Sequence, residues 1–231
     1  LLMGTLFEIT AVGPDDAPLD TWIDSAFSEV IRIERLTSDY DTNSMVGLLN
    51  GFNGTAQVVG IELARLLDRS AHLTEVTLGA FDITSGAATH LWRQAEINRR
   101  PPTNDELLET AGHIGPGKVI VDVSTGRVQT LPGTTIDLGA IAKGYAVDAA
   151  LASLIDLGVN GAIVNGGGDI ATFGRSAAGD KWRIGIRHPR GDAMQYFGVV
   201  PLSEGAIATT GDYERGYEIG DTVYSHIIDP G

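Results

Sequence analysis

The segment DLGAIAKGYAVD at residues 137–148 is the most informative stretch of this sequence. The strand-like tetrapeptide TTID, residues 134–137, leads into it, and an apolar helical pattern follows over residues 141–157. The pattern predicts a strand that turns sharply into a helix. A turn of this kind is a place where a protein backbone can approach a ligand closely.

The residues of this turn suit a polar or anionic ligand. Gly139 permits close backbone approach, and the first turn of the following helix has free N–H groups that attract anions. Asp137 and Lys143 add one carboxylate and one ammonium group on either side of the turn. The alternative interpretation is an ordinary strand-to-helix turn with a surface salt bridge. The glycine spacing excludes a Walker A phosphate loop.

The flanking sequence mixes strands and helices without a regular βαβ rhythm. Helices are predicted over residues 21–36 and 61–74 as well as 141–157. A hairpin is predicted with strands 118–123 and 127–131. Further strands are predicted at residues 6–11, 162–165, 182–186, 198–202 and 206–210. The sequence therefore predicts an α+β fold, a mostly antiparallel sheet with flanking helices.

Bulk composition limits the domain count and the partners. A chain of 231 residues with 43% hydrophobic residues suits one large domain or two closely joined lobes. The loop at residues 98–104 is the expected lobe boundary. The net charge of −14, from 16 basic and 30 acidic residues, argues against nucleic acid and against anionic lipid as partners. With no cysteine, thiolate chemistry is excluded, and no apolar run reaches the length of a membrane span.

Three other segments carry candidate chemistry. NGGGDI at residues 165–170 exposes backbone amides, or is simply a tight hairpin turn. GAFDITSG at 79–86 combines an aromatic ring, a carboxylate and hydroxyl groups, as a flat heterocycle requires, or is a helix end with Phe81 in the core. His226 in YSHIIDP, residues 224–230, has a polar setting in which a histidine can act as a general base.

The order of these segments resembles the ApbE family over almost the whole chain. Near the start, Met3-Gly4-Thr5 resembles the family's opening, and Ser38-Asp39-Tyr40, then Ser44 and Leu49-Asn50, resemble its next conserved segment. The later segments follow in the family's order: GAFDIT, DLGAIAKGYAVD, NGGGDI, WRIGIRHP, AIATTGDY and SHIIDP. Eight motifs in one order make chance agreement implausible.

The resemblance implies an ApbE-like, T-fold-like core and an FAD:protein FMN transferase activity. Such enzymes bind FAD, need Mg²⁺, attach FMN to a Ser or Thr of an acceptor protein and release AMP. The expected catalytic base is His226, and the main-chain oxygen of Ala140 is the expected metal ligand. Tyr40 is expected to stack on the isoalloxazine. The full set of expected FAD contacts is Met3, Tyr40, Ala80, Phe81, Asp82, Asp137, Lys143, Gly167 and Ile227.

The sequence departs from the family pattern at a few positions. Ile83 stands where the family often has proline, and Thr210 where it has serine. The family pattern continues after HIIDP with an Asp and a Thr of the metal site, whereas this sequence ends at Gly231. We therefore expect weak Mg²⁺ binding and a shortened C-terminus. Two alternatives stay open: a non-catalytic FAD-binding module, and an FAD pyrophosphatase that yields FMN and AMP.

The resemblance also bears on location. Family members commonly act on the outer side of the bacterial inner membrane, so we expect a place in the cell envelope, with the cytoplasm as the alternative.

Overall fold

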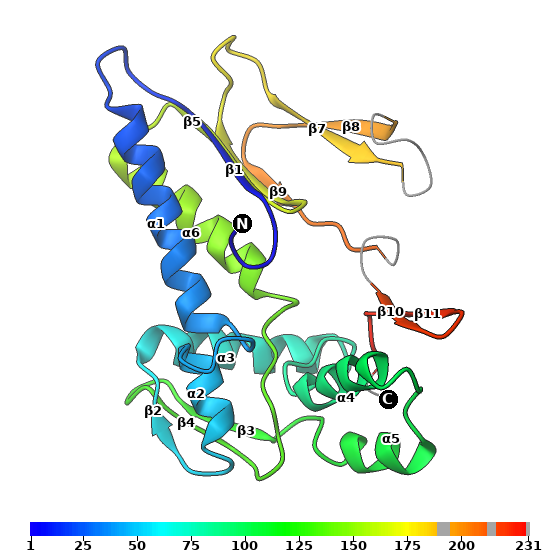
Figure 1. The fold of residues 1–231 in the computed structure, drawn as a ribbon. Coiled ribbons are helices and arrows are strands. Elements are labelled where there is room, and N and C mark those ends of the chain that lie inside the picture. The colour runs from blue at the N-terminus through cyan, green and yellow to red at the C-terminus, as the bar shows by residue number, and fades with distance from the viewer. Residues whose placement is uncertain (189–194, 212–215, 230–231) are drawn as a thin grey trace. The chain divides into compact units, whose positions relative to one another are not determined.

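The chain forms two compact units (Figure 1). The computed structural model describes residues 1–188, 195–211 and 216–229. Unit 1 comprises residues 1–34 and 142–213. Unit 2 comprises residues 35–141 and 214–231. The predicted boundary at residues 98–104 is wrong, because that loop lies inside unit 2.

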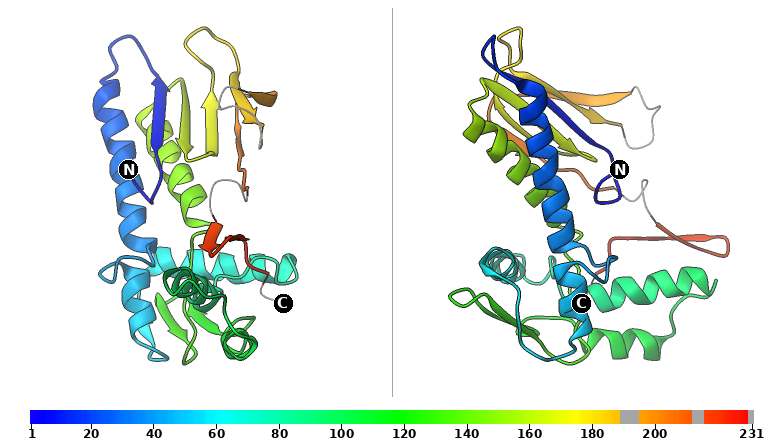
Figure 2. Two further views of the ribbon diagram at one scale, coloured as in Figure 1. Left: turned by 45° about the vertical axis from the view of Figure 1, so that its right-hand side comes forward. Right: turned by 60° about the vertical axis from the view of Figure 1, so that its left-hand side comes forward.

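Unit 1 is an antiparallel sheet with two long helices. Its four-stranded sheet has the order β1-β5-β6-β9, and β7 and β8 form a separate hairpin. Helix α6 packs on β5 and β6, and α1 runs beside α6 (Figure 2). The elements are β1 (Phe7–Val12), α1 (Leu19–Thr37, in this unit through Glu34), α6 (Ala142–Leu157), β5 (Gly161–Gly166), β6 (Asp169–Gly174), β7 (Trp182–Arg187), β8 (Tyr196–Leu202) and β9 (Gly205–Ile207).

The helices of unit 1 bury one apolar face each. Ala26, Val30 and Ile33 of α1 are fully buried, and their spacing of four and three residues places them on one side of the helix. Helix α6 buries Ala146 and Leu154. The burial of these faces explains why the periodicity predicted both helices correctly.

The NGGGDI segment is a tight hairpin turn in unit 1. Gly166 pairs with Asp169, so Gly167 and Gly168 form the turn between β5 and β6, with φ of 62° and 97°. Two successive left-handed residues are the signature of a hairpin turn that favours glycine. A Cβ at Gly167 would lie 2.2 Å from Oγ1 of Thr5, so the turn also packs closely on the N-terminal segment. The alternative interpretation of this motif is therefore confirmed in its geometry.

Unit 2 combines helices, a three-stranded antiparallel sheet of order β2-β4-β3, and a hairpin. Helix α3 packs on β3 and β4, while α4 packs on α5 and β10. The elements are α2 (Met45–Gly51), β2 (Gln57–Val58), α3 (Ile61–Val76), α4 (Gly86–Ile97), α5 (Asn104–Ala111), β3 (Val119–Asp122), β4 (Arg127–Thr130), β10 (Gly216–Ile219) and β11 (Thr222–Ser225). The predicted α+β class is confirmed, whereas α2, β2, α4, α5, β6, β10 and β11 were not predicted.

An extended segment, residues 134–137, joins the motifs of unit 2. Its backbone forms a parallel bridge from Thr135 to Ser85. Asp137 N–H donates to the carbonyl of Ile83 at 2.8 Å. A Cβ at Gly86 would lie only 2.6 Å from the carbonyl oxygen of Thr135, so only glycine fits there. The segment therefore holds the GAFDIT and DLGA motifs side by side.

Asn50 supports this segment from its other edge. Its side-chain amide donates to the carbonyl of Ile136 at 2.9 Å and accepts the N–H of Ile136 at 2.8 Å. The Asn50 amide thus makes the two hydrogen bonds with the backbone of Ile136 that a neighbouring strand would otherwise make. Leu49, near the end of α2, is 1% exposed, and Asn50 follows it directly. The Leu49-Asn50 motif therefore combines a core residue with the side chain that binds Ile136.

Replacing Asn50 by alanine is expected to destabilise the protein by about 1–3 kcal/mol, because two backbone groups of Ile136 lose their partner. Asn43 is a matched control, because the side-chain hydrogen bond that its amide makes among the described residues is local, to Asp41 at the surface. Asn43→Ala should change the stability by no more than about 0.5 kcal/mol. Urea unfolding of both variants measures the difference, and equal stabilities would contradict the role of Asn50.

Candidate functional site

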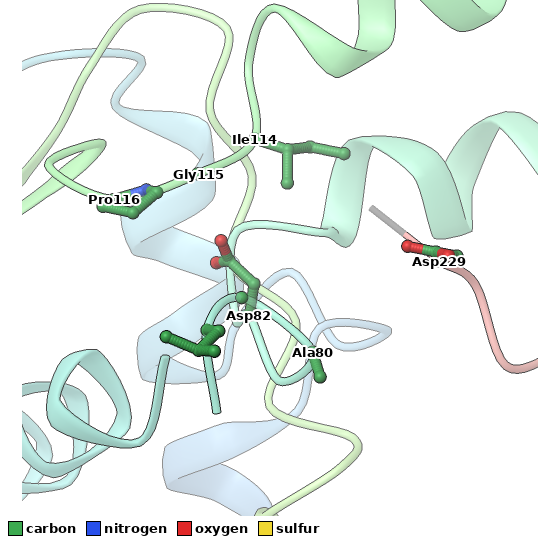
Figure 3. Close-up of a pocket in the computed structure, with 8 residues that line it drawn as sticks. Ala80, Asp82, Ile114, Gly115, Pro116 and Asp229 are labelled. Atoms are coloured by element: carbon green, nitrogen blue, oxygen red, sulfur yellow. The ribbon is translucent and has the colours of Figure 1, made fainter. Parts of the chain in front are cut away.

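A cavity of about 310 Å³ opens in unit 2 between the loop after α3 and the loop after α5 (Figure 3). The C-terminal part of the described chain contributes Asp229. The lining residues are Leu78, Gly79, Ala80, Asp82, Ile114, Gly115, Pro116 and Asp229. The volume lies at the lower end of the range of small-molecule sites. The GAFDIT motif therefore contributes to the wall of a cavity.

Hydrogen bonds within the cavity wall fix the Asp82 carboxylate. Its Oδ1 accepts the N–H of Thr84 at 2.8 Å and the hydroxyl of Thr84 at 2.6 Å. The N–H of Gly115 donates in turn to Oγ1 of Thr84 at 2.9 Å. The carboxylate points toward the Gly115–Pro116 side of the cavity (Figure 3). This chain of bonds joins the two loops and orients Asp82.

The charge of the cavity restricts what it can bind. Asp82 and Asp229 are both acidic, and the described lining residues include no Lys or Arg. Carboxylates accept hydrogen bonds and repel other anions. The cavity is therefore suited to the amino, imide or hydroxyl donors of a ligand and unsuited to its phosphates.

A second cluster of unit 2 brings together Asp39, Tyr40 and Arg93. Arg93, in α4, donates from Nη1 to Oδ2 of Asp39 at 3.0 Å and from Nη2 to the Tyr40 hydroxyl at 2.7 Å. The Arg93 Cζ atom lies 4.1 Å from the centroid of the Tyr40 ring. Burial, and next the charge of Asp137, raise the pKa of the Asp39 carboxyl, against the opposing effect of Arg93. Arg93 thus partly neutralises an acidic pair beside an exposed aromatic ring.

The β10–β11 hairpin packs on α4 at Trp92, the residue before Arg93. The Trp92 ring stacks on Tyr217, with centroids 6.0 Å apart, and contacts Tyr224 at 4.9 Å. The carboxylate of Glu96 accepts the N–H of Glu218 at 2.8 Å. His226 directly follows β11, so this anchor sets where the candidate base lies within unit 2.

The segment after the hairpin makes a local turn of its own. The N–H of Ile227 donates to Oγ of Ser225 at 3.0 Å. His226 is half-buried, whereas Ile227 is exposed. The side chains of this segment are therefore accessible to a ligand.

The predicted site residues divide between the units. Tyr40 is 73% exposed. Phe81 is half-buried and does not belong to the core, so its alternative interpretation as a core residue is wrong. Ala80 and Ala140 are exposed, while Asp137 is half-buried and accepts the N–H of Gly139 at 2.7 Å. Unit 2 holds Tyr40, Ala80, Phe81, Asp82, Asp137, Ala140, His226 and Ile227, and unit 1 holds Met3, Lys143 and Gly167.

All three unit 1 residues have well-defined partners, and the N–H of Gly167 donates to the carbonyl of Leu6 at 3.1 Å. The N–H of Met3 donates to the Glu34 carboxylate at 2.6 Å, and Met3 has a left-handed φ of 50°. Lys143, in the first turn of α6, pairs with Asp169 at 3.0 Å. A surface salt bridge at this turn was expected only as an alternative, and Asp169 was not predicted as the partner of Lys143.

Sequence reasoning missed Trp92 and Arg93. Both belong to α4, which was not predicted, and a Trp-Arg pair carries no motif that marks it as functional. The contact of Trp92 with the β10–β11 hairpin could have been suspected only from the aromatic residues Tyr217 and Tyr224.

Asp212, Tyr213, Pro189 and Pro230 of the family-like motifs lie outside the described residues. Within residues 1–188, 195–211 and 216–229, no three His, Asp or Glu side chains cluster to hold a metal. No helix in that part of the chain is long and apolar enough to cross a membrane.

Comparison with known proteins gives one consistent family. The sequence model of the ApbE family matches residues 3–231. The FAD:protein FMN transferase of Treponema pallidum is 31% identical over 246 aligned positions, which cover 100% of this chain and 68% of that protein.

Two solved structures are similar in fold. The ApbE protein of Thermotoga maritima matches with a TM-score of 0.90 and 32% identity, covering 100% of this chain and 74% of that one. The apo flavinyl transferase ApbE of Pseudomonas stutzeri matches with a TM-score of 0.85 and 26% identity, covering 100% of this chain and 72% of that one.

Replacing Trp92 by alanine is expected to loosen the β10–β11 hairpin. Each aromatic pair contributes about 0.5–1.5 kcal/mol, so amide hydrogens of residues 216–225 should exchange about 10- to 100-fold faster. His90, exposed on the same helix, gives the control His90→Ala, which should leave exchange unchanged. Hydrogen exchange followed by mass spectrometry measures both. Unchanged protection of the hairpin in a folded Trp92→Ala protein would show that the aromatic anchor is not needed.

Proposed function

The chain belongs to the ApbE family, and we propose that it transfers the FMN moiety of FAD onto a Ser or Thr hydroxyl of an acceptor protein, with release of AMP. One observation carries the proposal: the GAFDIT segment, an expected FAD contact, lines the cavity of unit 2 with its carboxylate held in place. The relative named FAD:protein FMN transferase supports the reaction type.

The proposed reaction is a phosphoryl-group transfer. The acceptor hydroxyl oxygen forms a bond to the phosphorus of the FMN half of FAD. The bond from that phosphorus to the bridging oxygen breaks, and AMP leaves with the bonding electrons. The hydroxyl proton passes to His226, because a neutral hydroxyl is a poor nucleophile. Catalysis of this kind depends on positioning and on neutralising charge.

The acidic cavity is proposed to bind one end of FAD. Its volume of about 310 Å³ is too small for a whole dinucleotide. Asp82 and Asp229 would accept hydrogen bonds from ring or sugar donors, and the apolar side chains of Ile114 and Pro116 would contact a flat ring. The phosphates would then lie outside this cavity, because no cation lines its described part.

Tyr40 is proposed to stack on the isoalloxazine. Its ring is 73% exposed and therefore available to a flat heterocycle. In unit 1, Lys143 lies at the N-terminal end of α6, where a cation and free N–H groups together suit a phosphate. We propose Lys143 as a phosphate contact on that ground.

Magnesium is proposed to bind only together with the substrate FAD. The resemblance gives the exposed carbonyl of Ala140 as a ligand, and the described residues hold no cluster of three His, Asp or Glu side chains. Mg²⁺ prefers one or two carboxylates together with substrate phosphates. The described residues alone do not make a complete magnesium site, so no step is assigned to the metal.

The acceptor and the location are proposed from the family alone. The acceptor is a protein with an accessible Ser or Thr, and the bacterial envelope is the proposed compartment. Labelling of envelope proteins in cells that express the chain would test both.

Product analysis tests the proposed function. The chain is incubated with FAD, Mg²⁺ and an envelope protein fraction, and flavin is followed after denaturation. The proposal expects FMN bound covalently to protein together with an equal amount of AMP. Free FMN with AMP would indicate a pyrophosphatase, and intact FAD bound to the chain would indicate a binding module. Either result would contradict the transferase proposal.

Replacing His226 by alanine is expected to lower the rate of FMN transfer by about 10²–10⁴, the usual effect of losing a general base. FAD affinity should stay within about twofold, because the imidazole acts on the acceptor proton. His72, exposed on α3, gives the control His72→Ala, which should transfer FMN at the wild-type rate.

Rates and FAD affinities of the three proteins are measured across pH 5–9. A His226→Ala protein with a normal rate and an unchanged pH profile would exclude His226 as the base.

A further inference from the structure

The loop that carries Tyr40, residues 38–44, is fixed at long range by one side chain. Its other side-chain hydrogen bonds among the described residues are local, such as Asp41 N–H to Ser38 Oγ at 3.2 Å and Asn43 N–H to Asp41 Oδ1 at 2.9 Å. Arg93 reaches it from α4, more than fifty residues along the chain. The position of this loop in unit 2 therefore depends on Arg93.

Arg93 restrains Tyr40 in three ways. Its two terminal nitrogens bind neighbouring residues, Asp39 at 3.0 Å and the Tyr40 hydroxyl at 2.7 Å. Its guanidinium also covers one face of the Tyr40 ring, at 4.1 Å from the centroid. A planar guanidinium with fixed donors can hold a carboxylate and a ring at once, which an ammonium cannot do. One face of the Tyr40 ring is thus covered and its tilt is set.

The surroundings of Arg93 explain why its guanidinium stays in place. The Arg93 side chain is 28% exposed and that of Asp39 is 15% exposed, so the ion pair is largely shielded from solvent. Asp137 lies close enough for its charge to act on both Asp39 and Arg93. Losing Arg93 would remove the cation that opposes the repulsion between Asp39 and Asp137, and that repulsion would displace the loop.

We propose that Arg93 is a positioning residue of the FAD site, which fixes the Tyr40 ring so that its uncovered face is ready to stack on the flavin. The inference rests on the proposed function, because it takes FAD as the ligand. Arg93 acts through Tyr40 and does not itself contact FAD. A ring that is already oriented loses less conformational freedom when the ligand binds, so the contribution of Arg93 is to FAD affinity.

The test compares Arg93→Met with Arg93→Lys, Tyr40→Ala and the double variant Tyr40→Ala/Arg93→Met. Arg100→Met is the matched control, because it removes an equal charge from an exposed arginine of the same unit. The dissociation constant for FAD, the shift of the flavin absorption band on binding, and kcat of FMN transfer are measured for each. Circular dichroism verifies that each variant is folded.

Arg93→Met is expected to raise the dissociation constant for FAD about five- to thirtyfold and to leave kcat within about twofold. The shift of the flavin band should fall to that of Tyr40→Ala. Arg93→Lys should lie between wild type and Arg93→Met, because it keeps the charge but loses the fork. If Arg93→Met does not fold, the FAD affinity of Arg93→Lys is the deciding measurement. The double variant should bind FAD as Tyr40→Ala does, because the arginine acts through the ring.

Three results would overturn the inference: wild-type FAD affinity in both Arg93 variants, an equal loss of affinity in Arg100→Met, or additive losses in the double variant. Additive losses would mean that Arg93 contacts FAD directly. A wild-type chain that binds FAD without transferring FMN contradicts the proposed transferase alone, because the affinities still test Arg93. A wild-type chain that binds no FAD contradicts both.

Discussion

The close passage of the extended segment 134–137 past Gly86 is the constraint on which the described site of unit 2 depends. The carbonyl of Thr135 lies where any Cβ at Gly86 would collide with it. Asn50 saturates the backbone of Ile136 on the other edge. Because this segment is held on two edges, the loop that bears Asp82 and the turn that bears Asp137 have fixed positions within the unit. A larger residue at position 86 would separate them.

Helix α4 extends this arrangement to the aromatic and basic residues. It begins at Gly86, against the extended segment, and its next two turns present Trp92, Arg93 and Glu96. Trp92 and Glu96 hold the hairpin that precedes His226, and Arg93 holds the Tyr40 loop. One helix therefore positions the expected base and the expected stacking ring. The single cation of this cluster also moderates the repulsion between Asp39 and Asp137, which matters in a chain with a net charge of −14.

The sequence predicted those parts of the fold that have strong periodicity. Helices α1, α3 and α6 were predicted because their apolar faces repeat every three to four residues, and β3–β4 because its turn chemistry is clear. Helix α4 was missed because small residues, Ala88 and Ala95, occupy the buried face that long apolar chains usually mark. Of the site, the motif residues were identified by resemblance. Arg93 and Trp92 could not be, because their roles arise from contacts with residues over fifty and over one hundred positions away.

Amide hydrogen exchange with and without FAD shows whether FAD contacts the described site of unit 2. Saturating FAD is expected to slow exchange in residues 38–41, 79–84 and 225–229, and AMP alone in only part of this set. Slower exchange that is confined to unit 1, or no change anywhere in these three segments, would show that FAD does not bind at this site.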